Sequence, residues 1–331
     1  MANKSVLARI PATVGNFAGA VNCAALALNA SLNVKVTPRQ DGAVGIRYFG
    51  ANGERVPRDR SNLVIRAMEA ALHLRQLEFT GADLEIYSSV PVGVGLGSST
   101  AAVLAGLVAS DQLYHLELEE KTLFDLAAIY ESRTDNLRAA WEGGFVACGE
   151  GDSSPGYRRT VVPENFLLRV VVPETHLATG RRETLKLQNG SGKDYLQRAA
   201  VLADFFARAG KGHAPDLSEP LPPTCEKAVA GLEEALQVRL PGLLSVFICG
   251  SGPAVGILAQ DNAAAAVHAV AEIFARHRVA MVAPEFAPTN AGARDWNAVC
   301  PELSTRPVRV LRPSLGAEGP SGLRKSPLIP A

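Results

Sequence analysis

The feature that most constrains this chain is a glycine-rich turn between a strand pattern and a helix pattern. In residues 84–90 apolar and polar side chains alternate, as in a β-strand with one buried face. Residues 91–100 read Pro-Val-Gly-Val-Gly-Leu-Gly-Ser-Ser-Thr, and residues 101–113 then have a helical pattern. Because glycine at alternate positions lets the backbone curl closely around a ligand, the sequence predicts a strand, a tightly curled loop and a helix.

The predicted loop at residues 93–100 is a candidate anion site. The helix after it would begin with unpaired N–H donors, and the natural anion for such a loop is a polyphosphate. Ser98, Ser99 and Thr100 add hydroxyl groups that can bind phosphate oxygens or Mg²⁺. The alternative is a glycine-rich turn with no ligand.

Several familiar site motifs do not fit the sequence. Gly-x-Gly-x-x-Gly fails because Thr100 stands where the third glycine would be, which disfavours a dinucleotide fold. Residues 189–194 imitate the end of a Walker A loop, but Leu187 and Asp194 stand where that motif has Gly and Ser or Thr. No Gly-x-Ser-x-Gly elbow precedes a helix, and no histidine has metal-ligand spacing, which argues against a zinc enzyme.

Charge and composition exclude other classes. The 331 residues include 33 basic and 33 acidic ones, and this balance gives no electrostatic support for binding nucleic acid or an anionic membrane. The longest clean apolar run, residues 101–109, is far shorter than the roughly 20 residues of a membrane-spanning helix. Five scattered cysteines indicate no disulfide framework. We therefore expect a soluble cytoplasmic protein without nucleic-acid or membrane partners.

Two further segments carry polar groups that chemistry could use. A capping-box pattern predicts a helix that begins near Thr122, with residues 131–136 at its end. Glu131 could complete a Mg²⁺ site with a serine hydroxyl of the loop, or it could belong to a solvated helix end. The turn at residues 250–253, Gly-Ser-Gly-Pro, needs by itself only a structural explanation.

The remaining pattern is that of an α+β protein. Strands are predicted at residues 5–10, 243–249 and 255–258, the second of them buried, and helices over residues 195–208 and 262–277.

Composition also predicts how the chain divides into domains. Periodicity breaks at residues 149–157, which predicts one domain over residues 1–155 and a second over 156–300. Residues 301–331 are rich in Pro, Gly and Arg, and we expect them to be a disordered tail.

In combination these segments resemble the GHMP small-molecule kinases, and within them the homoserine kinases. Residues 11–28 align without a gap with that family's first motif, and residues 95–99 match its ATP-phosphate loop. Residues 131–136, followed by Gly143-Gly144-Phe145, are similar to its Glu-Gly-His-Pro-Asp-Asn segment. The other matches, all in the expected order, are Asn62-Leu63-Val64, Gly250-Ser251-Gly252-Pro253 and Gly292-Ala293-Arg294.

The resemblance implies a two-domain α+β kinase. The N-terminal, ATP-binding domain would have the fold of ribosomal protein S5 domain 2, with a left-handed β-α-β element, and the C-terminal domain would be ferredoxin-like. The implied reaction is ATP- and Mg²⁺-dependent phosphorylation of the hydroxyl group of L-homoserine to O-phospho-L-homoserine, on the route to threonine. The partner would be this small molecule, and a homodimer would be unsurprising.

The resemblance also assigns residues to roles. Those assigned to ATP are Asn62, Pro91, Gly93, Gly95, Leu96, Gly97, Ser98, Ser99 and Thr100. Those assigned to Mg²⁺ are Ser98, Ser99 and Glu131. Those assigned to the substrate are Asn16, Asn22, Asp135, Asn136, Arg182, Gly250, Ser251 and Gly252. Thr179 with Arg181 or Arg182 resembles a Thr-x-x-x-Arg region, so Thr179 and Arg182 are the catalytic candidates, and no motif residue is a convincing catalytic base.

Three departures from the family pattern fall in the substrate half of the site. Asn22 replaces an Asp, Arg133-Thr134 replaces His-Pro, and a second substrate arginine expected near residues 225–227 is missing. An Asn cannot supply the negative charge that pairs with an ammonium group. Two other readings therefore stay open: a GHMP kinase that acts on a different small alcohol, and an ATP-binding relative without catalytic activity.

Overall fold

Two long antiparallel strands, β1 (Val6–Gly15) and β2 (Ala24–Pro38), pair along most of their length in the first sheet of this computed structural model, with β2 in the interior of the sheet. The structure describes residues 5–148, 156–163, 166, 168–173, 192–208, 217, 229–259 and 263–298. Although the pattern predicts a strand only to residue 10, β1 continues through Pro11 to Gly15, with a register shift between Pro11 and Ala12. Pro11 is tolerated because β1 pairs only with β2 and the missing N–H falls at this irregularity.

The first sheet is completed by four shorter strands. β3 (Val44–Phe49), β4 (Ala82–Ser88), β5 (Phe145–Cys148) and β6 (Tyr157–Thr160) join it in the order β3-β4-β2-β5-β6, with β1 on the other edge of β2. β3 and β4 are parallel, and α1 (Leu63–Leu74) connects them. The alternating burial of β4 confirms the predicted half-buried strand.

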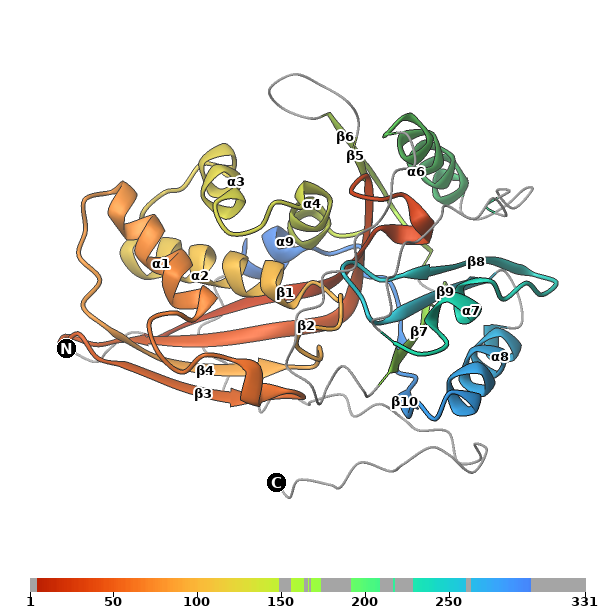
Figure 1. Ribbon diagram of the computed structural model, residues 1–331. Helices are drawn as coiled ribbons and strands as arrows, with labels where there is room; N and C mark the ends of the chain where they lie inside the picture. The colour runs from red at the N-terminus through yellow and green to blue at the C-terminus, as the bar shows by residue number, and fades with distance from the viewer. Residues whose placement is uncertain are drawn as a thin grey trace.

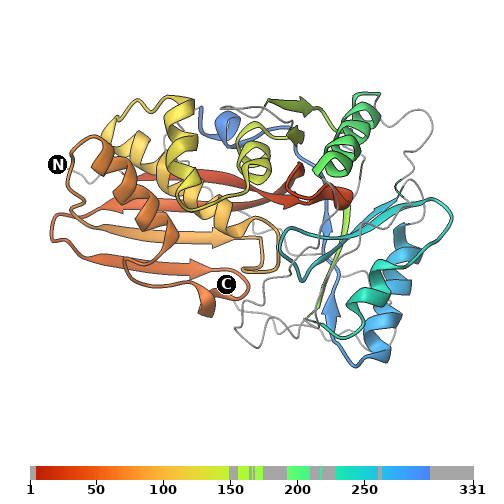
Figure 2. The ribbon, with the colours of Figure 1, turned by 45° about the horizontal axis from the view of Figure 1, so that its top comes forward.

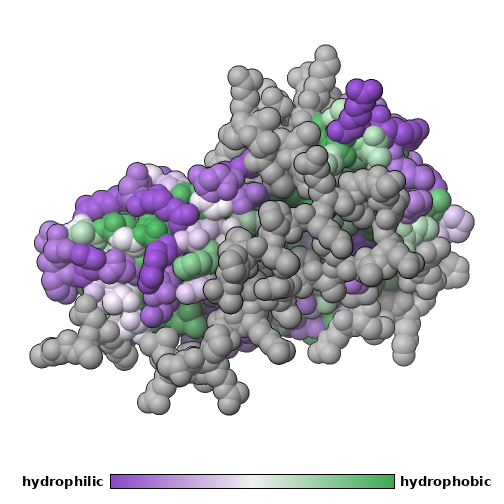
Figure 3. Space-filling model, turned by 90° about the horizontal axis from the view of Figure 1, so that it is seen from below, coloured by the Kyte–Doolittle hydropathy of each residue, from purple (hydrophilic) through white to green (hydrophobic). Residues whose placement is uncertain are grey.

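Helices cover one face of this sheet (Figures 1 and 2). They are α1, α2 (Ser98–Tyr114), α3 (Glu120–Ala128), α4 (Thr134–Glu142) and, from the far end of the chain, α9 (Ala293–Ala298). Leu84 and Ile86 of β4 contribute to the core between sheet and helices, whereas Glu85 forms an ion pair with Lys35 at 3.1 Å. Seen from below, the first half of the molecule accordingly shows a mainly hydrophilic surface with smaller hydrophobic patches (Figure 3).

The second sheet has the strand order β10-β7-β9-β8, with β11 also paired to β7. Its strands are β7 (Leu168–Pro173), β8 (Leu243–Ile248), β9 (Val255–Ala259), β10 (Met281–Val282) and β11 (Glu285–Phe286). The helices of this half are α6 (Gly192–Ala207), α7 (Leu232–Leu236) and α8 (Ala263–Arg276). Apart from the additional short helix α7 before β8, the order is strand, helix, two strands, helix and strand, as in ferredoxin-like domains.

An aromatic cluster joins the two halves. Phe17, in the short 3₁₀ helix η1 (Phe17–Gly19), is fully buried. Its ring centroid lies 5.6 Å from that of Phe145 in β5, 6.1 Å from Phe206 in α6 and 5.3 Å from Phe247 in β8. The segment that carries the first motif is therefore anchored in a core shared by both sheets.

The structure corrects several expectations. The helix predicted to start at Thr122 begins at Glu120, so Thr122 is not its cap. That helix ends at Ala128, so residues 131–136 are not its end: residues 131–133 form a loop, and residues 134–136 are the first turn of α4. β8, predicted to be buried, is only half-buried along its first four residues, because it is the edge strand of the second sheet.

The division into domains stays a prediction. β6, which falls in the predicted second domain, pairs with β5 in the first sheet. The tail at residues 301–331 and the catalytic candidates Thr179 and Arg182 lie outside the described residues. No helix in the described part of the chain is long and apolar enough to cross a membrane.

Candidate active site

The loop between β4 and α2 lies against two other segments of the chain near the centre of the molecule (Figure 1). The N–H of Thr13 in β1 donates to the Leu96 carbonyl at 3.3 Å, and the N–H of Ala254 donates to the Val94 carbonyl at 3.1 Å. Val94 and Leu96 are buried, whereas Gly93 is exposed. The loop is thus held by β1 on one side and by the β8–β9 turn on the other.

Two glycines in the loop are required by their conformation and by these neighbours. Gly95 and Gly97 have φ angles of 91° and 72°, which side chains other than glycine rarely adopt. A Cβ on Gly95 would lie 2.9 Å from the backbone nitrogen of Gly252, and one on Gly97 would collide with Thr13 Oγ1. These glycines are therefore needed for the close packing of the loop against β1 and the β8–β9 turn, whether or not a ligand binds.

α2 begins directly after this loop and has an open N-terminus. Its N-cap residue is Gly97, which offers no side-chain cap. The first N–H groups of a helix have no intrahelical acceptor and carry a partial positive charge, so they can bind an anion. The predicted loop and helix start thus occur together, while anion binding at this place stays a prediction.

Glu131 reaches the first turn of α2, although it comes from the loop before α4. Its Oε2 accepts hydrogen bonds from Thr100 Oγ1 at 2.8 Å and from Ser99 Oγ at 3.2 Å. Ser98 does not take part, because its Oγ accepts the N–H of Gly93 at 3.4 Å. Ser98 and Ser99 are both assigned to a metal by the resemblance, but only the hydroxyl group of Ser99 lies next to Glu131. Thr100 is buried, and its hydrogen bond orients the Glu131 carboxylate.

The first and third motifs are tied together beside the loop. Asn16 Nδ2 donates to the Gly250 carbonyl at 2.7 Å, and its Oδ1 accepts the N–H of Asn22 at 2.9 Å. The N–H of Gly250 donates to the Gly15 carbonyl at 2.8 Å. Asn16 is buried by these contacts, so it shapes the site, whereas the Asn22 side chain is exposed.

Asp135 and Asn136, in the first turn of α4, are buried next to these segments. Asp135 Oδ1 accepts the N–H of Asn136 at 2.8 Å, and its Oδ2 lies 3.8 Å from Nη2 of Arg133. Burial raises the pKa of the Asp135 carboxyl above its usual value, while the charge of Arg133 opposes this shift. Asn136 Oδ1 lies 2.6 Å from the point that a Cβ on Gly15 would occupy.

Four side chains in this region have buried polar atoms without a hydrogen-bond partner in the described part of the chain. These atoms are Thr13 Oγ1, Arg133 Nε and Nη2, Asp135 Oδ2 and Asn136 Oδ1. Buried polar groups in folded proteins are nearly always paired. Their accumulation around the loop indicates a place where a polar ligand completes the hydrogen bonding.

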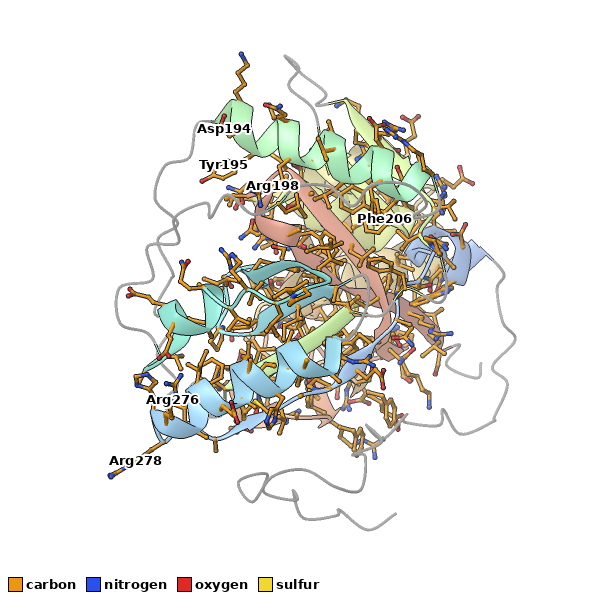
Figure 4. The ribbon with its side chains drawn as sticks, turned by 90° about the vertical axis from the view of Figure 1, so that its right-hand side faces the viewer. Asp194, Tyr195, Arg198, Phe206, Arg276 and Arg278 are labelled. Carbon is orange, nitrogen blue, oxygen red and sulfur yellow. The ribbon has the colours of Figure 1, made fainter. Side chains whose placement is uncertain are left out.

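The second half of the molecule also contacts the first motif. Arg198 of α6 donates from Nη1 to the Ala18 carbonyl at 3.1 Å, and Tyr195 is buried one turn earlier. Figure 4 shows Tyr195 and Arg198 on the side of α6 that faces the first sheet's end. α6 thereby fixes η1 and the backbone that leads to Asn22.

Comparison with known proteins agrees with this geometry. Residues 62–144 match the GHMP kinases N terminal domain family. A homoserine kinase of Microchaete diplosiphon is 30% identical over 274 residues, covering 80% of this chain and 88% of that protein. A homoserine kinase of Solibacter usitatus (strain Ellin6076) is 29% identical over 274 residues, covering 80% and 89%. The chain belongs to the homoserine kinase family of GHMP kinases.

A solved structure supports the fold of this family member. The crystal structure of homoserine kinase from Cytophaga hutchinsonii superposes with a TM-score of 0.66 at 23% identity, covering 88% of this chain and 97% of that one. The expected α+β GHMP kinase fold is thus confirmed.

Within this homoserine kinase family member, two arginines at the site were not assigned from the sequence. Arg55, in the 3₁₀ helix η2 (Gly53–Arg55), places Nη1 3.4 Å from the point that a Cβ on Gly93 would occupy. No spacing or motif marks Arg55. In the sequence Arg133 stands out only as a departure from His in the family motif, yet it contributes two of the unpartnered buried atoms.

Asn62, assigned to the adenine region by resemblance, has a structural role as well. Its Oδ1 caps α1 by accepting the N–H of Val64 at 3.0 Å, and its Nδ2 donates to the Pro57 carbonyl at 2.9 Å. Pro91 is half-buried at the start of the loop, and Ser251 is exposed in the β8–β9 turn. Contacts of Asn62, Pro91 and Ser251 with a ligand remain predictions.

Proposed function

We propose that this protein transfers the γ-phosphoryl group of ATP to the hydroxyl group of L-homoserine. The product would be O-phospho-L-homoserine, on the route to threonine. One observation carries the proposal. The glycine loop, β1 and the segment from Glu131 to Asn136 come together, and they bring Glu131 and a set of unpartnered buried polar atoms to one place. The names of the relatives, which cover most of this chain, support the same reaction.

The phosphate groups would be held mainly by the backbone. N–H groups of residues 95–99 and of the α2 N-terminus are fixed in place by contacts with β1 and the β8–β9 turn. Donors that are already oriented need no reorganisation when charge develops during phosphoryl transfer. Positioning and charge neutralisation would therefore do most of the catalysis, which agrees with the absence of a convincing base.

The residues present fit a Mg²⁺ ion. Mg²⁺ prefers hard oxygen ligands, and Ser99 Oγ and the Glu131 carboxylate lie within 3.2 Å of each other beside the loop. Ser98, on the same turn, offers a further hydroxyl group. The described residues contain no group of three or more His, Cys, Asp or Glu side chains that could hold a metal ion by themselves, so phosphate oxygens and water would supply the other ligands. When bound, the ion would offset the charge of the β- and γ-phosphates.

The acceptor would bind on the side of the loop where Asn16, Asp135 and Asn136 are buried. The free Oδ2 of Asp135 and the free Oδ1 of Asn136 can accept hydrogen bonds from an ammonium or a hydroxyl group. Asn22, whose side chain is exposed, would lie at the edge of this site, and Gly250 and Gly252 would contribute backbone groups.

A different small alcohol is the second candidate substrate. It is favoured by the neutral, exposed Asn22 and by Arg133, which change the charge of the acceptor side. A non-catalytic role is disfavoured, since a protein that only binds ATP has little need of the Glu131 carboxylate next to Ser99. We further propose that residues 1–155 form the ATP-binding domain, that residues 156–300 form the second domain, and that the enzyme works in the cytoplasm, where it could form a homodimer.

A coupled ADP-release assay with L-homoserine, mevalonate and galactose side by side tests the proposal. We expect turnover with ATP and Mg²⁺ that is fastest with homoserine. Faster turnover of another alcohol would replace the substrate. ATP binding without turnover of any acceptor would support the non-catalytic reading.

A further inference from the structure

We propose that Arg133 binds the carboxylate of the acceptor, and that this enzyme recognises its substrate by that carboxylate more than by its ammonium group. The inference rests on the proposed function and deepens it. It concerns a residue that this chain has in place of the family's His.

The position of Arg133 is the first argument. It precedes α4, and its N–H donates to Glu131 Oε1 at 3.2 Å. Its guanidinium lies between two backbone segments: Nη2 stands where a Cβ on Gly15 would be, and Nη1 is 3.2 Å from the corresponding point on Gly250. Glycine at position 15 leaves room for the guanidinium, and Gly250 lies close on its other side, so the side chain is packed into the acceptor side.

The unused hydrogen-bonding capacity of Arg133 is the second argument. Its side chain is 18% exposed, and Nε and Nη2 are buried without a partner among the described residues. The 3.8 Å between Nη2 and Asp135 Oδ2 allows charge attraction but is too long for a hydrogen bond. Nε and Nη2 are neighbouring donors on a planar fork, and the ligand that matches such a fork is a carboxylate or a phosphate.

A carboxylate fits the surroundings better than a phosphate. The phosphate groups of ATP would be bound by the N-terminus of α2, and through Mg²⁺ by the Ser99–Glu131 pair, so they do not need Arg133. Arg133 instead lies among Gly15, Asp135, Asn136 and Gly250, on the side that the acceptor would occupy.

The charges on the acceptor side agree with this assignment. Asn22 is neutral where the family has Asp, and the charge of Asp135 is balanced by Arg133. The acceptor side thus has no uncompensated negative charge for an ammonium group, whereas the unpartnered Nε and Nη2 of Arg133 can still donate to a carboxylate. The expected class of acceptor is a small hydroxy acid, with or without an amino group.

The test compares two acceptors that differ only in the carboxylate. L-homoserine and its reduced analogue L-2-amino-1,4-butanediol are assayed with the wild type, Arg133→Gln and Arg133→Lys. Arg278→Gln is the matched control, because Arg278 is exposed beyond the end of α8 and points away from the molecule (Figure 4). Melting temperatures and KM for ATP show whether each variant is folded and binds nucleotide.

We expect Arg133→Gln to lower kcat/KM for homoserine about 10- to 100-fold, as for the loss of a charge-assisted hydrogen bond, with KM for ATP nearly unchanged. The same variant should change kcat/KM for the diol less than about threefold, because that acceptor has no carboxylate to lose. Arg133→Lys keeps the charge but not the fork, so its loss with homoserine should be intermediate. If Arg133→Gln does not fold, Arg133→Lys carries the comparison alone.

Equal losses with both acceptors, or a raised KM for ATP, would place Arg133 on the phosphate and overturn the inference. Unchanged kinetics with homoserine would overturn it as well. Failure of the proposed function looks different: the wild type and Arg278→Gln would both fail to phosphorylate homoserine. The same variants would then be compared on mevalonate, if that is accepted, and on its reduced analogue without the carboxylate.

Discussion

Thr100 Oγ1 lies 2.8 Å from Glu131 Oε2, which joins the first turn of α2 to the loop that leads into α4. This hydrogen bond fixes a carboxylate beside the helix N-terminus where the phosphate groups would bind. Because an anion at this place would repel phosphate, we expect a cation between them to strengthen nucleotide binding. The relationship therefore makes Mg²⁺ dependence a direct test of the site.

Glu131→Gln should weaken Mg²⁺ use, because the amide keeps the shape but loses the charge. We expect the Mg²⁺ concentration for half-maximal activity to rise about tenfold or more, as for the loss of an interaction with a charged group of about 1.5–3 kcal/mol. The measurement is steady-state rate against Mg²⁺ at saturating ATP. Glu119→Gln is the control, since Glu119 is exposed before α3 and makes no side-chain cap. An unchanged Mg²⁺ dependence would remove Glu131 from the metal site.

Gly97→Ala should raise KM for ATP and also lower the melting temperature. The φ of 72° costs a side chain about 1–2 kcal/mol, and the new Cβ would press on Thr13. Gly42→Ala is a matched control, because Gly42 has the same φ of 72° but nothing within 4 Å of a new Cβ. Comparison of the two variants by thermal unfolding and ATP kinetics separates backbone strain from damage to the site. Equal effects on KM for ATP in both variants would count against the loop assignment.

Asp135→Asn should stabilise the protein at neutral pH and lose this effect in acid. Burial raises the pKa of the Asp135 carboxyl, so the folded protein holds this proton more tightly than the unfolded chain does. The stability that protonation contributes is complete below the ordinary pKa of about 4 and is lost as pH rises through the raised value. The variant, which cannot ionise, should therefore melt above the wild type at pH 8 and together with it near pH 4.

The control for this prediction is Asp125→Asn on an exposed pair with Lys121, where little change is expected at either pH. A variant that melts below the wild type at pH 8 would mean that attraction to Arg133 outweighs burial.

The glycine loop and α2 could be predicted because both signals are local: alternation before the loop and helical spacing after it. Glu131 could be matched to the metal site only through the family pattern, since nothing in its own segment indicates Thr100 as a partner. The helix before it was predicted two residues late, because Glu119 begins α3 without a side-chain cap. The Phe17 cluster combines four distant elements and has no local sequence signal.

Asn22→Asp adds a negative charge to the acceptor side, whereas Arg133→Gln removes a positive one, so it tests recognition of the ammonium group instead of the carboxylate. The backbone N–H of Asn22 is bonded to Asn16, so its exposed side chain is free to turn toward a ligand. A charge-assisted hydrogen bond contributes about 1.5–3 kcal/mol and a neutral one about 0.5–1.5 kcal/mol, which would lower KM for homoserine about fivefold to tenfold. Solvent screening at this exposed position makes these values an upper bound.

2,4-Dihydroxybutyrate provides the internal control for Asn22→Asp, because it keeps the carboxylate and the hydroxyl group but lacks the ammonium group. Its KM should not fall, and KM for ATP should stay nearly unchanged, since the new charge lies on the acceptor side. A lower KM for both acceptors would mean that the carboxylate acts on the fold rather than on the ammonium group. Complete loss of homoserine turnover would mean that this pocket depends on a neutral residue at position 22, because a second anion beside Asp135 or the phosphate groups is not tolerated. In that case the small-alcohol alternative would become the better account of the substrate.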